Sequence, residues 1–183
     1  MQRLVLLAVL VVSACQGPAA HEAAPPDVAR ADVVVVGGTS AGVIAAVQVA
    51  RMGRSVLLLD PDGRLGGLSS GGLGATDIGN KGAIGGLSRE FYRRVAAHYA
   101  DDDAWPWQER GAYREGRKVE GEDSMGTFEP HVALAIFEDL VREHDVEVWR
   151  GERLDRSPDG ITMREGRIAS IRTESGREAR GEV

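Results

Sequence analysis

A glycine-rich turn of six residues, Gly37-Gly38-Thr39-Ser40-Ala41-Gly42, joins an apolar stretch directly to a stretch of small and apolar residues. Residues 32–36 are rich in β-branched side chains, which is typical of a parallel strand buried on both faces. Residues 43–52 contain no helix breaker, so they predict a helix. A second strand is predicted over 55–59, and it ends at Asp60. This order predicts a strand–turn–helix–strand unit of a parallel sheet.

The turn has the spacing of a site for the pyrophosphate of a dinucleotide. Gly37 permits a tight turn, Gly42 permits close packing of the helix on the sheet, and the helix N-terminus offers free N–H groups to phosphate. Asp60 is placed to accept hydrogen bonds from an adenosine ribose. Thr39 replaces the middle glycine of the usual G-x-G-x-x-G pattern, and its hydroxyl or that of Ser40 would cap the helix or touch phosphate. A purely structural βαβ turn is the alternative.

Glycines cluster again between Gly63 and Gly86. Such glycines let backbone amides lie against a second flat or phosphorylated group, which favours a flavin over a nicotinamide cofactor. The sequence resembles the FAD-dependent oxidoreductases of the glutathione-reductase-like superfamily with two dinucleotide folds, and most closely a bacterial family known simply as FAD-dependent oxidoreductases. The segments that carry the resemblance are VVVVGGTSAG, Asp60, RLGGLSSGGLG from Arg64, TDIGNKGAIGG from Thr76 and REFYRRV from Arg89.

The resemblance implies FAD as the cofactor and a small molecule as the substrate. In that family the first motif holds the pyrophosphate, the acid holds the adenosine ribose, and an Arg-x-Gly-Gly step lies along the pyrophosphate and ribityl chain. The implied FAD residues are Gly37, Gly38, Thr39, Ser40, Ala41, Gly42, Asp60, Arg64, Gly66 and Gly67. The loop 77–81 has two interpretations. It would either face the flavin ring or the substrate, or form a turn that caps the helix beginning near Ile84. No pattern identifies a catalytic residue.

The predicted fold class is α/β, a Rossmann-like parallel sheet with inserted helices and an antiparallel β-meander. Helices are expected over 85–100, with Leu87, Phe91, Val95 and Tyr99 in the core, and from Pro130 to about His144, with Val132, Ile136, Phe137, Leu140 and Val141 inward. The third parallel strand is expected over 146–149, beside the first strand, and the meander over 161–164, 167–173 and 178–183. The resembled family continues into a further parallel strand and a substrate domain. We therefore expect residues 31–183 to be an incomplete FAD-binding domain.

The first residues predict export. Met1-Gln2-Arg3 and the apolar run to Val12 form a signal peptide over 1–14 that is too short to span a bilayer. Its end, Val12-Ser13-Ala14-Cys15, resembles the lipobox of bacterial lipoproteins, so we expect Cys15 to be lipidated and residues 15–30 to be a flexible tether. The protein would then lie in the bacterial cell envelope, with the lipid anchor as its only membrane contact. An ordinary secretory signal is the alternative.

Composition limits the other partners. A net charge of −6 and no basic patch argue against nucleic acid. Cys15 is the only cysteine and the histidines lack ligand spacing, so no metal site is expected. Trp105, Trp107 and Tyr113 would either wall a substrate pocket or pack an insertion. The function predicted is that of an exported FAD-dependent oxidoreductase; the alternatives are a non-catalytic nucleotide- or ligand-binding lipoprotein and an NAD(P)-dependent dehydrogenase. Nothing in the sequence indicates the oligomeric state.

Overall fold

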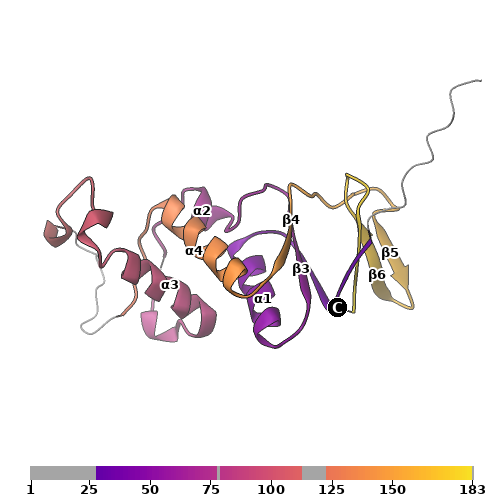
Figure 1. Cartoon of the computed structure of the whole chain (residues 1–183), viewed down its shortest axis with the longest axis horizontal. Helices are drawn as coiled ribbons and strands as arrows, with labels where there is room; N and C mark the ends of the chain where they lie inside the picture. The colour runs from indigo at the N-terminus through magenta and orange to yellow at the C-terminus, as the bar shows by residue number, and fades with distance from the viewer. Residues whose placement is uncertain (1–27, 78, 113–122, 183) are drawn as a thin grey trace, which may run out of the picture.

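The computed structural model describes residues 28–77, 79–112 and 123–182. The predicted signal peptide, Cys15 and Tyr113 lie outside these described residues. The molecule is elongated, with a helical region at one end, a meander at the other and a parallel sheet between them (Figure 1). No helix in the described ranges combines the length and the apolar character that crossing a membrane requires.

The parallel sheet has three strands in the order β2-β3-β4. Its strands are β2 (Val33–Val36), β3 (Val56–Asp60) and β4 (Glu147–Arg150). The central strand β3 is buried along its whole length, whereas β2 is only partly buried and Val36 is 53% exposed. The expectation of a first strand buried on both faces is therefore wrong, because β2 lies at the edge of this sheet.

The third parallel strand does not lie beside the first. β4 pairs with β3 in register Leu58↔Val148, so the crossover after Asp60 extends the sheet on the far side of β3. The predicted neighbour was wrong because a crossover helix is compatible with either side of the sheet. The observed placement follows the usual order of a Rossmann half, in which the third strand lies outside the second.

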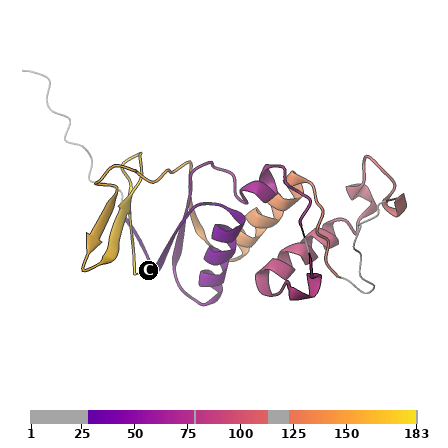
Figure 2. The same cartoon turned by 180° about the vertical axis from the view of Figure 1, so that it is seen from behind.

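The helices lie on one side of this sheet and continue beyond it along the molecule (Figure 2). They are α1 (Ser40–Arg51), α2 (Leu68–Gly71), α3 (Gly86–His98) and α4 (Pro130–Glu143), with short 3₁₀ turns at Lys81–Ala83, Asp102–Ala104 and Arg110–Ala112. Figure 2 shows α1 in front of the sheet, with α4 and α3 following it along the molecule. The predicted inward residues of α3 and α4 are all buried, and the rings of Phe91 and Phe137 stack with their centroids 4.7 Å apart.

The two faces of the parallel sheet build separate cores, because successive residues of a strand point to opposite faces. Val56 and Leu58 pack with the helices. Leu57 and Leu59 pack on the other side with Trp149, Ile171 and Ala179. The sheet is thus the middle layer between the helices and the meander.

The meander strands are β5 (Ile161–Arg164), β6 (Arg167–Arg172) and β7 (Glu178–Gly181), antiparallel as predicted. A fourth strand, β1 (Val28–Ala31), pairs with β7 in parallel, which gives the order β1-β7-β6-β5. Residues 28–30 therefore belong to the folded domain and not to the tether. Their sequence, Val-Ala-Arg, carries little strand signal, and the hydrogen bonds that order it come from β7, about 150 residues away in the chain.

Candidate functional site

The glycine turn between β2 and α1 is tightly closed. Gly37 has a φ of +112°, a conformation that favours glycine, and its N–H donates to the carbonyl of Leu59 at 2.8 Å. A Cβ on Gly42 would lie 1.9 Å from the carbonyl oxygen of Gly37. The turn can therefore close only with glycine at position 42.

Thr39 caps α1. Its Oγ accepts a hydrogen bond from the N–H of Gly42 at 3.2 Å, and its extended backbone lets the helix begin at Ser40, three residues before the predicted start. Ser40 has a different role, since its Oγ donates to the carbonyl of Gly66 at 2.8 Å and lies 2.9 Å from the Oγ of Ser69. Of the two hydroxyls considered for the cap, the structure uses Thr39.

Asp60 ends the central strand directly against this turn. It is 2% exposed, and a Cβ on Gly38 would lie 2.4 Å from its Oδ1. Oδ1 receives a long hydrogen bond of 3.5 Å from the N–H of Asp62, whereas the buried Oδ2 has no hydrogen-bond partner within the described part of the chain. Burial raises the pKa of this carboxyl, an effect that the hydrogen bond from Asp62 and the charge of Arg150 only partly offset.

The segment after Asp60 returns to the same turn. Gly66 forms a parallel bridge with Thr39, and its N–H donates to the carbonyl of Gly38 at 2.7 Å. Gly66 and Gly67 have φ values of +101° and +53°, and a Cβ on Gly66 would lie 2.5 Å from the ring of Phe137. Both glycines are therefore required by backbone conformation, by packing or by both.

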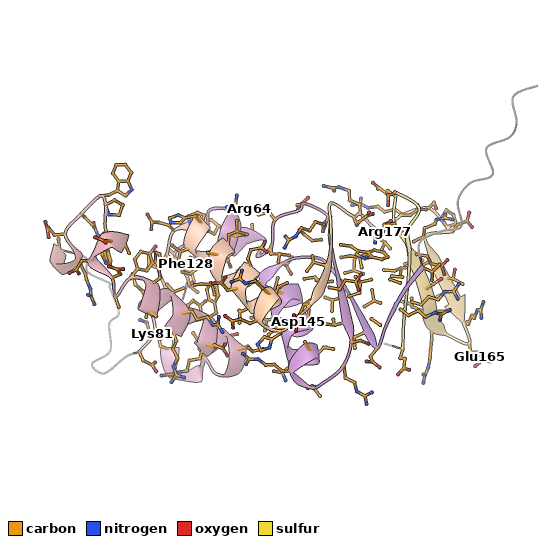
Figure 3. The ribbon with its side chains drawn as sticks, viewed as in Figure 1. Arg64, Lys81, Phe128, Asp145, Glu165 and Arg177 are labelled. Carbon is orange, nitrogen blue, oxygen red and sulfur yellow. The ribbon has the colours of Figure 1, made fainter. Side chains whose placement is uncertain are left out.

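Arg64 lies beside α2 (Figure 3). Its side chain is exposed, and its guanidinium donates to the carbonyl of Ser70 at 2.7 Å. The Oγ of Ser70 in turn donates to the carbonyl of Leu65, which fixes the loop that carries Arg64. The structure thus brings all ten predicted cofactor residues to one edge of the parallel sheet, where β2 and β3 end.

A groove of about 660 Å³ begins at this edge. Ser40, Ala41 and Ser69 line it near the start of α1, and the rings of Phe91, Tyr92 and Phe137 also line it. The volume falls in the range of pockets that bind small molecules and cofactors. The glycine turn therefore contacts the buried carboxylate of Asp60 through Gly38 on one side. On its other side it adjoins a largely apolar groove, which the hydroxyl groups of Ser40 and Ser69 line.

These features fit the adenosine diphosphate half of a dinucleotide. The unpartnered Oδ2 of Asp60 is an acceptor that a ribose hydroxyl would satisfy, and the start of α1 presents N–H groups to a pyrophosphate. The sequence model of the FAD dependent oxidoreductase family matches residues 32–183. This chain belongs to the FAD-dependent oxidoreductase family. The match also decides for FAD over the nicotinamide cofactors that the turn alone left open.

Solved structures with the same fold are much longer than this FAD-dependent oxidoreductase chain. The L-amino acid deaminase of Proteus vulgaris is 19% identical, with a TM-score of 0.55 over 88% of this chain and 47% of its own. A 3-ketosteroid dehydrogenase of Rhodococcus jostii RHA1 is 16% identical, with a TM-score of 0.52 over 88% of this chain and 46% of its own. At these identities the likeness concerns the fold. No curated protein sequence matches the chain.

Asn80 and His144, two further residues considered in the sequence analysis, have local structural roles. Asn80 accepts a hydrogen bond from the N–H of Gly82 at 3.0 Å and so caps the 3₁₀ turn Lys81–Ala83. The next helix, α3, begins after Gly85 without a side-chain cap, so the loop 77–81 does not cap that helix. His144 accepts a hydrogen bond from Nε of Arg51 at 3.0 Å. Within residues 28–77, 79–112 and 123–182, no three His, Cys, Asp or Glu side chains gather as metal ligands would.

Proposed function

We propose that residues 28–182 form the part of a flavin-dependent oxidoreductase that holds the ADP half of FAD. The observation that carries this proposal is the buried carboxylate of Asp60, whose Oδ2 has no partner among the described residues and which packs against the glycine turn. An unpaired buried charge is costly for a fold, so its presence here is explained by a ligand that donates hydrogen bonds to it.

Each part of the edge then has a role in binding. Asp60 accepts from the adenosine ribose, and the N–H groups at the start of α1 bind the pyrophosphate. Ser40 is a positioning residue, since its hydroxyl ties the Gly66 loop to the helix. The hydroxyl end of the groove, at Ser40 and Ser69, adjoins the pyrophosphate position, and we place the flavin half of the cofactor there.

The bound flavin supplies the hydride or electron transfer, and the protein binds and orients it. The rings of Phe91 and Phe137 that line the groove are apolar, which suits a flat aromatic ring and excludes water from one of its sides. The chain spans less than half of the two solved proteins described above. We propose a small molecule as the substrate.

Binding of cofactor fragments tests this assignment. Equilibrium dialysis of the purified chain against FAD, ADP, FMN and NAD should show that FAD binds most tightly, that ADP competes with it, and that FMN binds more weakly because it lacks the adenosine. FMN binding as tight as FAD binding would contradict the assignment of Asp60 and the turn to the ADP half.

We also propose that the protein is exported and anchored to the bacterial cell envelope through a lipid on Cys15. The support is the sequence Val12-Ser13-Ala14-Cys15 directly after the apolar run of the leader. With β1 beginning at Val28, the tether between Cys15 and the folded domain would comprise residues 16–27. Such a tether, fully extended, reaches about 40 Å, so the folded domain would stay close to the membrane.

A further inference from the structure

A second pocket lies away from the edge of the parallel sheet where β2 and β3 end and FAD is proposed to bind. It is located between the C-terminal end of α3 and the N-terminal end of α4. Its volume is about 230 Å³. Aromatic side chains form much of its wall, and Phe128, which lies between α3 and α4 in Figure 3, is one of them. Tyr99, Trp105, Trp107 and Glu129 also line it. The pocket therefore combines several aromatic rings with a carboxylate.

The carboxylate of Glu129 is held in a fixed orientation. The hydroxyl of Tyr99 donates to its Oε2 at 2.7 Å and accepts from the N–H of Glu129 at 2.9 Å. Within the described residues Glu129 forms no salt bridge, and its other oxygen, Oε1, accepts no hydrogen bond. The N-terminus of α4 accounts for an acidic residue at this position. It does not account for the aromatic wall around it.

The rings of Trp105 and Tyr99 are held in place by packing and a hydrogen bond. Trp105 packs on Tyr99 with ring centroids 5.2 Å apart, and its indole Nε1 donates to the carbonyl of Tyr99 at 3.1 Å. Trp107, on the same segment, is 88% exposed while it lines the pocket. The ring of Trp107 is therefore accessible to a ligand that enters the pocket.

We propose that this pocket binds a small organic cation, a quaternary or alkylated ammonium group. Aromatic faces attract such cations through their negative potential, and alkylated ammonium is weakly hydrated, so it enters an apolar pocket more easily than a bare ammonium. Glu129 supplies the counter-charge. A neutral ligand of the same shape would cover Glu129 without compensating its charge, at a cost in desolvation. This site goes beyond the FAD assignment and stands without it.

Choline and its uncharged isostere, in which carbon replaces nitrogen, are the probes that test the proposal. Calorimetric titration of the purified chain should give binding of choline about tenfold or more tighter than binding of the isostere. Equal affinities would show that the pocket recognises shape alone, and the absence of choline binding at millimolar concentration would also overturn the proposal.

Two variants locate the binding. Glu129→Gln keeps an acceptor for Tyr99 and removes the charge, and Trp107→Ala removes an exposed ring; each should weaken choline about tenfold. Glu174→Gln, which removes one charge from the exposed meander turn, is the matched control and should leave choline affinity unchanged. Circular dichroism and Tm establish that each variant is folded. If choline binds a folded Trp107→Ala and Glu129→Gln as tightly as the parent, the site is not this pocket.

Discussion

The carboxylate of Asp60 packs on the backbone of Gly38 so closely that a Cβ at position 38 would lie 2.4 Å from Oδ1 and 2.6 Å from Cγ. Gly38 belongs to the turn after β2, and Asp60 is the last residue of β3. The contact therefore joins the two ends of the strand–turn–helix–strand unit at the point where the ribose is proposed to bind.

Gly38→Ala should destabilise the fold and weaken FAD. The added methyl forces the Asp60 carboxylate to move, and overpacking of this kind costs about 1–3 kcal/mol. The double variant Gly38→Ala/Asp60→Ala removes the two shortest contacts, those with Oδ1 and Cγ, and leaves only the Cβ of residue 60 at 2.9 Å. It should therefore recover part of the lost stability without recovering FAD affinity. Thermal melts and FAD dialysis measure both. Gly111→Ala is the control, because a Cβ there meets no atom of the described residues within 4 Å. An equal loss of stability in the control would show that the clash with Asp60 is not the cause.

The carboxylate of Asp60 should lower the stability of the cofactor-free protein and raise its affinity for FAD. Without FAD, Asp60→Asn replaces a buried charge that lacks a partner by a neutral amide, so the free energy of unfolding should rise at neutral pH by on the order of 1 kcal/mol. Asp60→Ala should weaken FAD about 10- to 100-fold, since a hydrogen bond to a charged group is lost, and FMN affinity should not change. Denaturant melts measure the change in the free energy of unfolding, and equilibrium dialysis measures the change in affinity for FAD and FMN. A fall in stability on Asp60→Asn would show that the carboxylate serves the fold.

The same residue predicts a pH dependence. Burial raises the pKa of Asp60 in the folded state, so the folded protein holds this proton up to a higher pH than the unfolded chain does. The contribution of Asp60 to stability is then greatest below about pH 4, the ordinary range of an aspartate, and is lost as the pH rises through the raised pKa. The stability advantage of Asp60→Asn should accordingly appear on raising the pH. An advantage that grows as the pH falls would contradict this sign.

Arg94 should contribute to stability through two ion pairs, one that joins α3 to α4 and one within α3. Its guanidinium lies 2.6 Å from Glu143 and 2.8 Å from Glu90. Hydrogen bonding from Arg94 lowers the pKa of Glu143; for Glu90, burial acts to raise the pKa, but the hydrogen bonds from Arg94 and Arg51 outweigh it and the pKa is lowered. Lowered pKa values give stability that is present above the ordinary glutamate range and is lost as the pH falls through the folded values.

Arg94→Met should therefore lower the free energy of unfolding at pH 7 by about 1 kcal/mol, because these side chains are partly exposed and solvent screens them. The difference from the parent should shrink in acid and in high salt. Arg142→Met is the control, since Arg142 pairs with Asp139 on α4 alone and its side chain is 71% exposed. Melts of both variants across pH settle the outcome, and a loss that persists unchanged in acid would show that packing, and not charge, is responsible.

Cys15→Ala should release the protein from the membrane fraction or stall its processing. The thiol is the atom that would carry the lipid, and alanine offers no substitute. Fractionation of cells that express the parent or the variant, with the mature mass measured for each, provides the test. A variant that stays fully membrane-bound with an unchanged mature mass would exclude the lipid anchor.

The cofactor edge could be predicted from the sequence because its signals are local. A β-branched run, a turn in which Gly42 cannot carry a Cβ and an acid at the end of the next strand act within about thirty residues. The antiparallel meander could also be predicted, because alternating polar and apolar residues flank the turn Glu165-Gly166. In the structure both turn residues adopt positive φ. Thr39 and Ser40 are the two possible caps, and the structure separates them: the N–H of Gly42 donates to Thr39, whereas the hydroxyl of Ser40 donates to Gly66.

The sequence by itself determined the class of cofactor and most of the elements, with β1 as an exception, because strand and helix periodicity and glycine conformation depend on neighbours along the chain. Only the tertiary structure decided that β4 lies beside β3, that β1 joins β7, and that Tyr99 orients Glu129 across thirty positions of sequence. A strand can form the same backbone hydrogen bonds with any other apolar strand. Which strands pair is therefore decided by how the helices and the meander pack on the two faces of the sheet. The same packing buries Asp60 and leaves its Oδ2 without a partner among the described residues.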